Sequence, residues 1–389
     1  MGDDFLSTPT PSLVIRAGRL VCPASGIDSP GAVTVAGDRI ASVQRDRSDA
    51  PAPPGARVLE FPDGILLPGL IDLHAHPGWG DSKHDVDPDR RLLARGTTTA
   101  ISQGDAGAAN WPLYRDTVIE AARLRIKLAM HLALPGESAP HPSHSKLDDL
   151  DVDACARAVR DGGDHVWGIA VTTNVLGTGD IDPREILARG IAAAEAVGCP
   201  IIYGSRYHTD WPLEDQLKRL RPGDMVTYCF HDGPDRIVRD GRVLDCVHEA
   251  RARGVLFDTG HGMKSFVYDV AEAALADGFP PDAISTDIQR RHVGANPPHD
   301  LPLVMSKLRA AGMPEADIWP RVTERPAQIL GMADEIGRLA PGACADLVVL
   351  DWAPSPEPLA DCKGVTRAGG QWHTRLVVRG GSIVETTSS

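Results

Sequence analysis

The sequence has no long hydrophobic run, and no stretch approaches the roughly 20 apolar residues that a membrane-spanning helix needs. Its opening residues, MGDDFLSTPTPS, contain acidic but no basic side chains, which is not typical of a targeting segment. Internal repeats and low-complexity tracts are also missing. We therefore expect a cytoplasmic protein without a membrane partner.

Cysteines are few and widely separated along the chain. Their number, seven, is odd, and no two of them are spaced as CxxC. This pattern argues against a disulfide framework and against a zinc knuckle, and it favours reduced, buried thiols. The seven are Cys22, Cys155, Cys199, Cys229, Cys246, Cys344 and Cys362.

Basic residues are in the minority. The chain has 40 Lys and Arg against 53 Asp and Glu, which gives a formal net charge of −13. Such a chain is not attracted to the phosphates of nucleic acid or to an anionic membrane. We expect a small-molecule substrate and no nucleic acid, and a homo-oligomer is compatible with the sequence.

Hydrophobic residues make up 42% of the 389 residues, enough for a large core. Both ends of the chain carry short apolar runs separated by Gly and Pro, which is typical of small antiparallel strands. Residues 48–56, SDAPAPPGA, predict a loop. The runs are Leu13–Ile15, Ala32–Val35, Ile40–Val43, Ala345–Leu350 and Thr374–Val378.

In the middle of the chain, short apolar strands alternate with helical stretches such as Pro183–Val197 and Leu244–Arg253. This part spans about 270 residues, close to the roughly 250 of a (β/α)8 barrel. We expect an α/β fold with a (β/α)8 TIM barrel over residues 65–336. A small composite β-sandwich domain would be formed by both chain termini, residues 1–64 and 337–389. The strand candidates are Ile65–His74, Thr97–Gly104, Ile126–Leu132, Val166–Val171, Pro200–Tyr203, Asp224–Phe230, Gly254–Thr259 and Ala283–Asp287.

The first of these strands ends in the sequence Ile71-Asp72-Leu73-His74-Ala75-His76. Side chains two residues apart in a strand share a face, so His74 and His76 lie close enough to bind one divalent metal ion together. Barrel enzymes place their reactive groups at the carboxyl ends of the strands, where this pair stands. The pair therefore predicts a metal site.

Several motifs, in the same order along the chain, resemble those of the amidohydrolase superfamily of metal-dependent hydrolases. LLPGLIDLHAHPG (66–78) resembles its first-strand signature, and GRLAPGACADLVVLD (337–351) resembles its return to the terminal β domain. Other matches favour the deacetylase-like branch near dihydroorotase. They are DPD (87–89), DAG (105–107), RPGDMVTYCFH (221–231), GVLFDTGHG (254–262), AISTDI (283–288) and DLPLVMSKLRAAGMP (300–314).

The resemblance implies a set of metal ligands, of which this chain retains only part. His74, His76 and Asp287 match the first-strand histidines and the eighth-strand aspartate. The family's other ligands are a carboxylated lysine or glutamate on the fourth strand and one histidine each on the fifth and sixth. Those positions hold Ala170, Gly204 or Tyr203, and Tyr228.

Without a bridging anion, a second ion would lack both charge neutralisation and ligands. We therefore expect one divalent ion, zinc, with Mn, Fe and Ni also suited to two imidazoles and a carboxylate. A fourth ligand could come from His208, His231 or His131, although each could equally be a hydrogen-bonded structural histidine.

Other polar residues follow the later strands. Lys264 and His261 could contact substrate, and the alternatives are a solvated lysine and a loop-stabilising histidine. With Tyr228, His231 and His208, they are the candidate substrate-binding residues. Further cationic and polar groups near the fifth and eighth strands suggest an acidic substrate; they are Arg206, Tyr207, Arg290, Arg291 and His292.

These residues predict a mononuclear metal-dependent hydrolase that cleaves an amide, lactam or acyl ester of a small anionic substrate with an activated water. Asp287 would be the general base and then the general acid, and Tyr228 or His231 would stabilise the oxyanion. The alternative is a metal-dependent lyase, decarboxylase or isomerase, or an inactive small-molecule-binding relative. The segment 135–153 is expected to be an exposed loop, with a lid over the site as the alternative.

Overall fold

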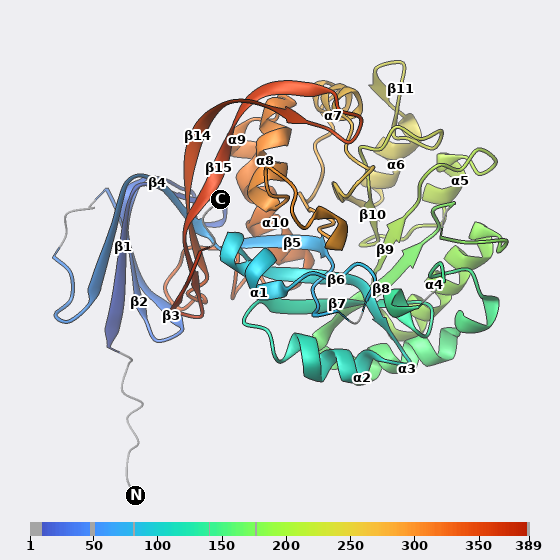
Figure 1. The fold of residues 1–389 in the computed structure, drawn as a ribbon, viewed down its shortest axis with the longest axis horizontal. Helices are drawn as coiled ribbons and strands as arrows, with labels where there is room; N and C mark the ends of the chain where they lie inside the picture. Colours follow the sequence, from blue (N-terminus) through green and yellow to red (C-terminus); the bar gives the residue numbers. More distant parts are fainter. Residues whose placement is uncertain (1–9, 47–50, 81, 140, 176, 387–389) are drawn as a thin grey trace, which may run out of the picture.

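The computed structural model describes residues 10–46, 51–80, 82–139, 141–175 and 177–386. The first nine residues and residues 48–50 of the predicted loop lie outside this range. Two sheets organise the chain, one built from its two ends and one from its middle (Figure 1). All seven cysteines are free thiols, as the sequence predicts, but only four of them are buried, and Cys199, Cys246 and Cys362 are partly exposed.

Strands from both ends of the chain join in one sheet with the order β16-β15-β14-β4-β1-β2-β3. The junction is β4, which pairs in parallel with β1 and antiparallel with β14. Alternate residues of these strands, such as Leu13 with Ile15 and Leu347 with Val349, form a separate hydrophobic core under this sheet. The strands are β1 (Pro11–Cys22), β2 (Ile27–Ala36), β3 (Arg39–Arg45), β4 (Arg57–Pro68), β14 (Leu347–Ala360), β15 (Thr366–Arg379) and β16 (Ser382–Val384).

The hairpin of β14 and β15 is much longer than the sequence predicts, because Pro354 and its neighbours suggest a break there. Its far half leaves the terminal sheet and packs against α8 (Leu301–Ala310), crossing the top of Figure 1. Trp372 packs against Trp319 and Trp352, with ring centroids 4.9 and 4.8 Å apart. This aromatic contact buries apolar surface and so stabilises the extension.

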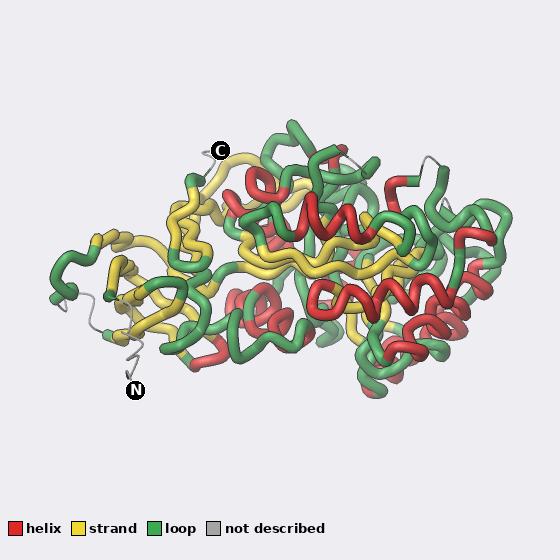
Figure 2. The backbone as a smooth tube through the Cα atoms, turned by 90° about the horizontal axis from the view of Figure 1, so that it is seen from below, coloured by secondary structure: helices red, strands yellow, loops and turns green. Residues whose placement is uncertain are grey.

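The middle of the chain forms a curled parallel sheet with seven strands in the described residues, in the order β13-β10-β9-β8-β7-β6-β5. Helices lie on either side of the strand layer in Figure 2. The predicted first strand is divided at Gly69, so that β4 joins the terminal sheet and β5 the parallel one. The strands are β5 (Leu70–Ala75), β6 (Thr97–Gly107), β7 (Arg125–His131), β8 (Val166–Thr172), β9 (Ile201–Gly204), β10 (Met225–Thr227) and β13 (Leu256–Phe257).

The predicted eighth strand is not a regular strand, but residues 283–288 lie between the two edges of the parallel sheet. Asp258 pairs with Ala283 on one side, and Ala75 pairs with Ile288 on the other. The Asp287 amide donates to the carbonyl of His74 (2.7 Å), which connects this segment to β5. The ends of the sheet are therefore bridged at the point where Asp287 stands.

The helices follow the capping signals of the sequence. Helix α4 (Pro183–Val197) has the predicted bounds, with Asp182 as its N-cap and Gly198 in a left-handed conformation at its end. A short β11–β12 hairpin (Val238–Arg239, Arg242–Val243) precedes α6. No helix in the described part of the chain is both long and apolar enough to cross a membrane. The other helices are α1 (Pro88–Arg91), α2 (Trp111–Tyr114), α3 (Val152–Gly162), α5 (Leu213–Leu217), α6 (Asp245–Ala252), α7 (Tyr268–Ala276), α9 (Glu315–Ile318) and α10 (Glu324–Ile329).

Candidate metal centre and substrate cavity

His74, His76 and Asp287 meet at the carboxyl end of the parallel sheet. Each offers a ligand atom, and these atoms lie within 4.8 Å of one another. Asp287 Oδ1 is 3.5 Å from His74 Nε2 and 3.2 Å from His76 Nε2. All three side chains are buried. Catalytic zinc sites have three protein ligands and one water molecule, and two imidazoles with one carboxylate can supply the three protein ligands.

The backbone around these residues is held by Asp72, which lies on β5 beside His74. Its carboxylate accepts hydrogen bonds from the amides of His74 and Thr286, both at 3.1 Å, and from the hydroxyl of Thr286. Asp287 itself has a positive φ of 47°, which is unusual for a residue with a side chain. Backbone strain of this kind is typical of functional sites, and the Asp72 network stabilises it here.

Each histidine is oriented by a partner on its second ring nitrogen. His76 Nδ1 donates to Asp105 Oδ1 (3.0 Å). The Thr227 hydroxyl donates to Asp258 Oδ2 (2.9 Å), so it accepts from His74 Nδ1 (2.8 Å). Both rings therefore turn Nε2 toward Asp287. Such partners fix the tautomer of metal-binding histidines.

Burial and neighbouring charges set the protonation of the cluster. Burial lowers the pKa of His74 to about 4, so this ring is neutral. For His76, burial is outweighed by Asp105 and Asp287, which raise its pKa well above the usual value. Burial acts to raise the pKa of Asp287, but His74 and His76 lower it below the usual range. Asp287 is therefore ionised.

The cluster fits a divalent cation. His74 Nε2 is buried and has no hydrogen-bond partner among the described residues, although such atoms are costly to leave unpaired. A cation on this nitrogen would satisfy it. Next to the carboxylate, a Cβ on Gly262 would lie 2.1 Å from Asp287 Oδ2, so only glycine leaves room for the side chain of Asp287.

The positions where the family's other ligands are expected offer no ligand to a second ion. Ala170 is buried in β8 and has no polar group. The Tyr203 hydroxyl donates to Gln216 Oε1 (2.9 Å) on α5, away from the cluster. A Cβ on Gly204 would lie 2.7 Å from Tyr228 Cε2, so the Tyr228 ring fills the space at this strand end.

A cavity of about 410 Å³ opens beside His76 and Asp287. Tyr228 and Lys264, two of the predicted substrate-binding residues, line it together with Arg206 and Arg291. The Arg206 guanidinium lies 4.0 Å from the centre of the Tyr228 ring, and that ring is 5.1 Å from His74. Tyr228 also has a positive φ, 67°.

The other predicted histidines are placed outside the residues that line this cavity. His208 Nε2 donates to the carbonyl of Thr173, His231 Nδ1 accepts from the amide of Gly233 (3.0 Å), and His261 Nε2 contacts Lys307 Nζ (3.0 Å). His131 Nδ1 accepts from the amide of Ala133 (3.0 Å), which leaves the proton of the neutral ring on Nε2. None of these four joins the His74–His76–Asp287 group in the described residues.

The prediction that residues 135–153 form an exposed loop is wrong for the first half of the segment. Glu137, Ser143 and His144 are buried and line the cavity, whereas Pro142 and Leu147 are exposed. Gln103 on β6 also lines the cavity, although it was not among the predicted site residues. The signal for Gln103 was its place near the end of a strand two residues before Asp105.

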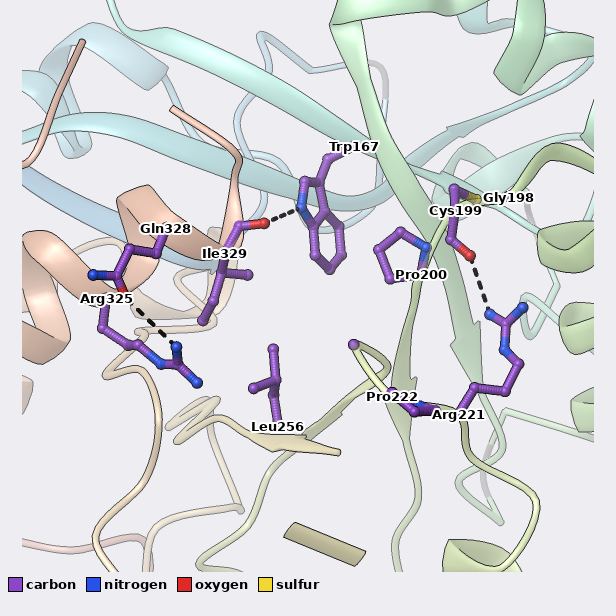
Figure 3. Close-up of a pocket in the computed structure, with 11 residues that line it drawn as sticks. Trp167, Gly198, Cys199, Pro200, Arg221, Pro222, Leu256, Arg325, Gln328 and Ile329 are labelled. Carbon is purple, nitrogen blue, oxygen red and sulfur yellow. Dashed lines mark hydrogen bonds between the residues drawn. The ribbon is translucent and has the colours of Figure 1, made fainter. Parts of the chain in front are cut away.

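A second cavity, of about 510 Å³, lies at the opposite end of the sheet, where the strands begin (Figure 3). The residues that line it stand where strands begin: Trp167 is the second residue of β8, Pro200 directly precedes β9, and Leu256 is the first residue of β13. The polar groups drawn there bond to one another, as the Trp167 indole does to the carbonyl of Ile329 (2.9 Å). Because barrel active sites lie at the other end, we assign this cavity no chemistry.

The chain is similar to several known proteins. A family model described as "Amidohydrolase family" matches residues 235–383. A deacetylase of Agrobacterium fabrum is 30% identical over 342 residues, which cover 86% of this chain and 82% of the relative. A deacetylase of Brucella anthropi is 30% identical over 82% of this chain and 79% of its own.

Two solved structures are also similar. The structure of a dihydroorotase has a TM-score of 0.85 and 28% identity, covering 97% of this chain and 99% of that chain. The structure of an adenine deaminase has a TM-score of 0.84 and 26% identity, covering 96% of this chain and 99% of that chain. The chain therefore belongs to the amidohydrolase superfamily of metal-dependent hydrolases, enzymes that cleave amide-type bonds.

Proposed function

We propose that this enzyme is a mononuclear metal-dependent hydrolase that cleaves an amide, lactam or acyl ester of a small anionic substrate. The observation that supports it is the His74–His76–Asp287 cluster, in which the ligand atoms lie within 4.8 Å of one another. Ala170 and Gly204 offer no side-chain ligand where a second ion would need one. The ion we propose is a single Zn²⁺, and Mn, Fe or Ni would suit the same atoms.

The proposed mechanism assigns a task to each residue of the cluster. When bound, the ion supplies a Lewis acid that polarises the scissile carbonyl and acidifies a water molecule. The Asp287 carboxylate, which is ionised, accepts a proton from the attacking water and returns it to the leaving group. The buried Tyr228 hydroxyl keeps its proton, because burial raises its pKa, and it donates to the developing oxyanion.

The anionic substrate is proposed from the cations at the cavity. Arg206, Lys264 and Arg291 line it, and no carboxylate forms a salt bridge with any of them among the described residues. Arg206 Nη1 instead donates to the Ser265 hydroxyl, and its Nε is buried without a partner. A substrate carboxylate would pair with these groups.

The scaffold we propose is the (β/α)8 barrel of residues 65–336, with residues 283–288 as its eighth strand. The bridges of this segment to β5 and to Asp258 support this proposal. Residues 1–64 and 337–389 would form the composite β-sandwich domain, supported by the pairing of β4 with β1 and β14.

The test is hydrolysis by metal-loaded protein and by its Asp287→Asn variant, with N-acyl amino acids and α-acyloxy acids as substrates. We expect kcat to fall about 10³-fold in the variant, since a positioned acid–base group contributes roughly that much. Elemental analysis should find one ion per chain in the wild type.

The matched control is Asp334→Asn, whose carboxylate is fully exposed, and which should keep wild-type kcat. Full activity after treatment with a chelator, or unchanged kcat in Asp287→Asn, would contradict the proposal.

A further inference from the structure

In the wall of the cavity that His76 and Asp287 also line, buried polar side chains lack hydrogen-bond partners among the described residues. Gln103 is 4% exposed and His144 fully buried. Both amide atoms of Gln103 and both ring nitrogens of His144 have no partner among the described residues. His131 Nε2, next to His144, also has no hydrogen-bond partner within the described part of the chain. We call Gln103 and His144 the amide subsite; His131, which stacks on His144, lies outside the residues that line the cavity.

Buried polar atoms without partners are rare, and each costs roughly 1–3 kcal/mol. Several of them in one place indicate that they bond to something that enters from solvent. Gln103 and His144 both line the cavity of about 410 Å³, so a molecule in that cavity can reach them.

The amide subsite is connected to the metal cluster by a row of side chains. The rings of His76 and His84 have centroids 5.2 Å apart. Glu137 then lies between two histidines, with Oε2 3.6 Å from His84 Nε2 and Oε1 3.7 Å from His131 Nε2. His144 stacks on His131 at 4.3 Å. One small molecule can therefore contact both places.

Ala170 makes room for this arrangement. A Cβ on Gly104 would lie 2.8 Å from His131 Cδ2 and 3.2 Å from the Cβ of Ala170, so the His131 ring and Ala170 occupy neighbouring space. A long side chain at position 170 would compete with that ring. The loss of the expected fourth-strand ligand and the presence of the subsite are thus coupled sterically.

The side chains of the subsite are uncharged and offer both hydrogen-bond donors and hydrogen-bond acceptors. Gln103 presents a donor and an acceptor, and burial lowers the pKa of His144 well below its usual value, so this ring also has one of each. The charge of Glu137 is matched by Lys83 Nζ at 2.8 Å.

A metal ion suits these atoms poorly. His131 Nδ1 is already bonded to the backbone of Ala133, and the Lys83 ammonium lies against the carboxylate of Glu137. Because Lys83 already neutralises Glu137, this pair offers no net positive charge to a ligand carboxylate. A group with its own N–H donors and carbonyl acceptor satisfies the unpaired atoms without a net charge.

We propose that the amide subsite binds an uncharged carboxamide group of the substrate, while the cations at the cavity bind its carboxylate. This inference rests on the proposed function in taking the molecule in the cavity to be an anionic substrate. Sites built to hydrogen-bond a polar group reject analogues that lack it, because their own buried groups are then left unpaired.

The test measures binding to zinc-loaded protein by calorimetry, with three probes of similar size: succinamate, 4-oxopentanoate and succinate. 4-Oxopentanoate replaces the NH₂ of succinamate with a methyl group. We expect succinamate to bind about tenfold more tightly than either other probe. Gln103→Leu and His144→Phe should each reduce this preference to about twofold or less and leave 4-oxopentanoate binding within about threefold of wild type.

Gln328→Leu, a substitution in the cavity of Figure 3, is the matched control and should keep the full preference. Equal affinity for the three probes, or no succinamate binding at about 10 mM, would show that the subsite holds only water and would overturn the proposal. Loss of a second bound metal ion from Gln103→Leu would also overturn it. Because the preference is measured by binding and not by turnover, failure of the hydrolase proposal is separately visible.

Discussion

The strand ends around the cavity fall into two groups, a ligand side and a replaced side, which differ in the side chains that they carry. On the ligand side, β5 and residues 283–288 carry His74, His76 and Asp287, and Asp105 and Asp72 hold them in place. On the replaced side, β8 and β9 carry Ala170 and Gly204. The same fold therefore carries three potential metal ligands on one side and none at Ala170 and Gly204 on the other.

This difference shows that other side chains occupy the space on the replaced side, so that no empty ligand position is left there. The Tyr228 ring covers Gly204, and Arg206 lies 4.0 Å over that ring. A guanidinium therefore lies over the side chain that fills the space at Gly204. A fixed cation can stabilise charge without needing ligands of its own.

The largest expected effect comes from breaking the ligand side. His76→Ala removes one of three ligands, so bound zinc should fall from one to less than about 0.1 per chain, with kcat/KM lower by about 10³-fold. Elemental analysis and initial rates measure both. His248→Ala, a half-exposed histidine on α6, should change neither. Zinc retained at one per chain in His76→Ala would mean that the ion is bound elsewhere.

A smaller effect comes from weakening the support of the same side. Asp105→Asn leaves an acceptor for His76 Nδ1 but removes its charge, and partners of this kind are worth about 10–100-fold in metal affinity. Competition with a chelator measures the dissociation constant. Asp116→Asn, on the surface, is the control. An affinity within about twofold of wild type in Asp105→Asn would remove the argument that this carboxylate orients the ring.

Placing a carboxylate at position 170 tests whether this one substitution is enough to let the replaced side bind a second ion. Ala170→Glu should still bind one ion, because Gly204 contributes no ligand and Tyr228 covers it. It should also lower the free energy of unfolding by about 2–3 kcal/mol, since a charge is buried beside His131. Elemental analysis and urea unfolding measure these. Ala170→Gln is the matched control for volume, and two ions per chain in Ala170→Glu would refute the account.

Much of the ligand side could be predicted from the sequence because its signals are local. His74 and His76 are two residues apart in a strand, and α4 is bounded by Asp182 and Gly198. Asp287 followed from a motif. The resemblance also located Ala170, Gly204 and Tyr228 as replaced positions.

The refilling of the replaced side depends on contacts between distant residues, and one sequence does not encode these in a readable pattern. Gln103 and His144 are far apart along the chain and meet only because a loop folds over the strand ends. Polar residues with prolines nearby predict an exposed loop. The long β14–β15 hairpin was missed for the same reason, because its stabilising partner Trp319 lies on a separate element earlier in the chain.

The smallest expected effect concerns the buried charge of Lys307, which contacts His261. Lys307 on α8 is 7% exposed, and burial lowers its pKa to about 8, although Cys362 and Asp361 act to raise it. Between pH 8 and the usual lysine value of 10.5, the unfolded chain binds more protons than the folded one, so this group makes stability rise with pH. Below pH 8 the ammonium is charged in both states and its burial costs stability.

Lys307→Met should therefore be more stable than wild type at pH 7, by about 1 kcal/mol, and the difference should shrink as the pH rises toward 10. Urea unfolding at several pH values measures it. The exposed Lys218→Met should show no such trend. A constant difference across this range would mean that Lys307 keeps its proton, stabilised by the His261 Nε2 that lies 3.0 Å from its Nζ. In that case the ligand side would be backed by a fixed positive charge, as the replaced side is by Arg206.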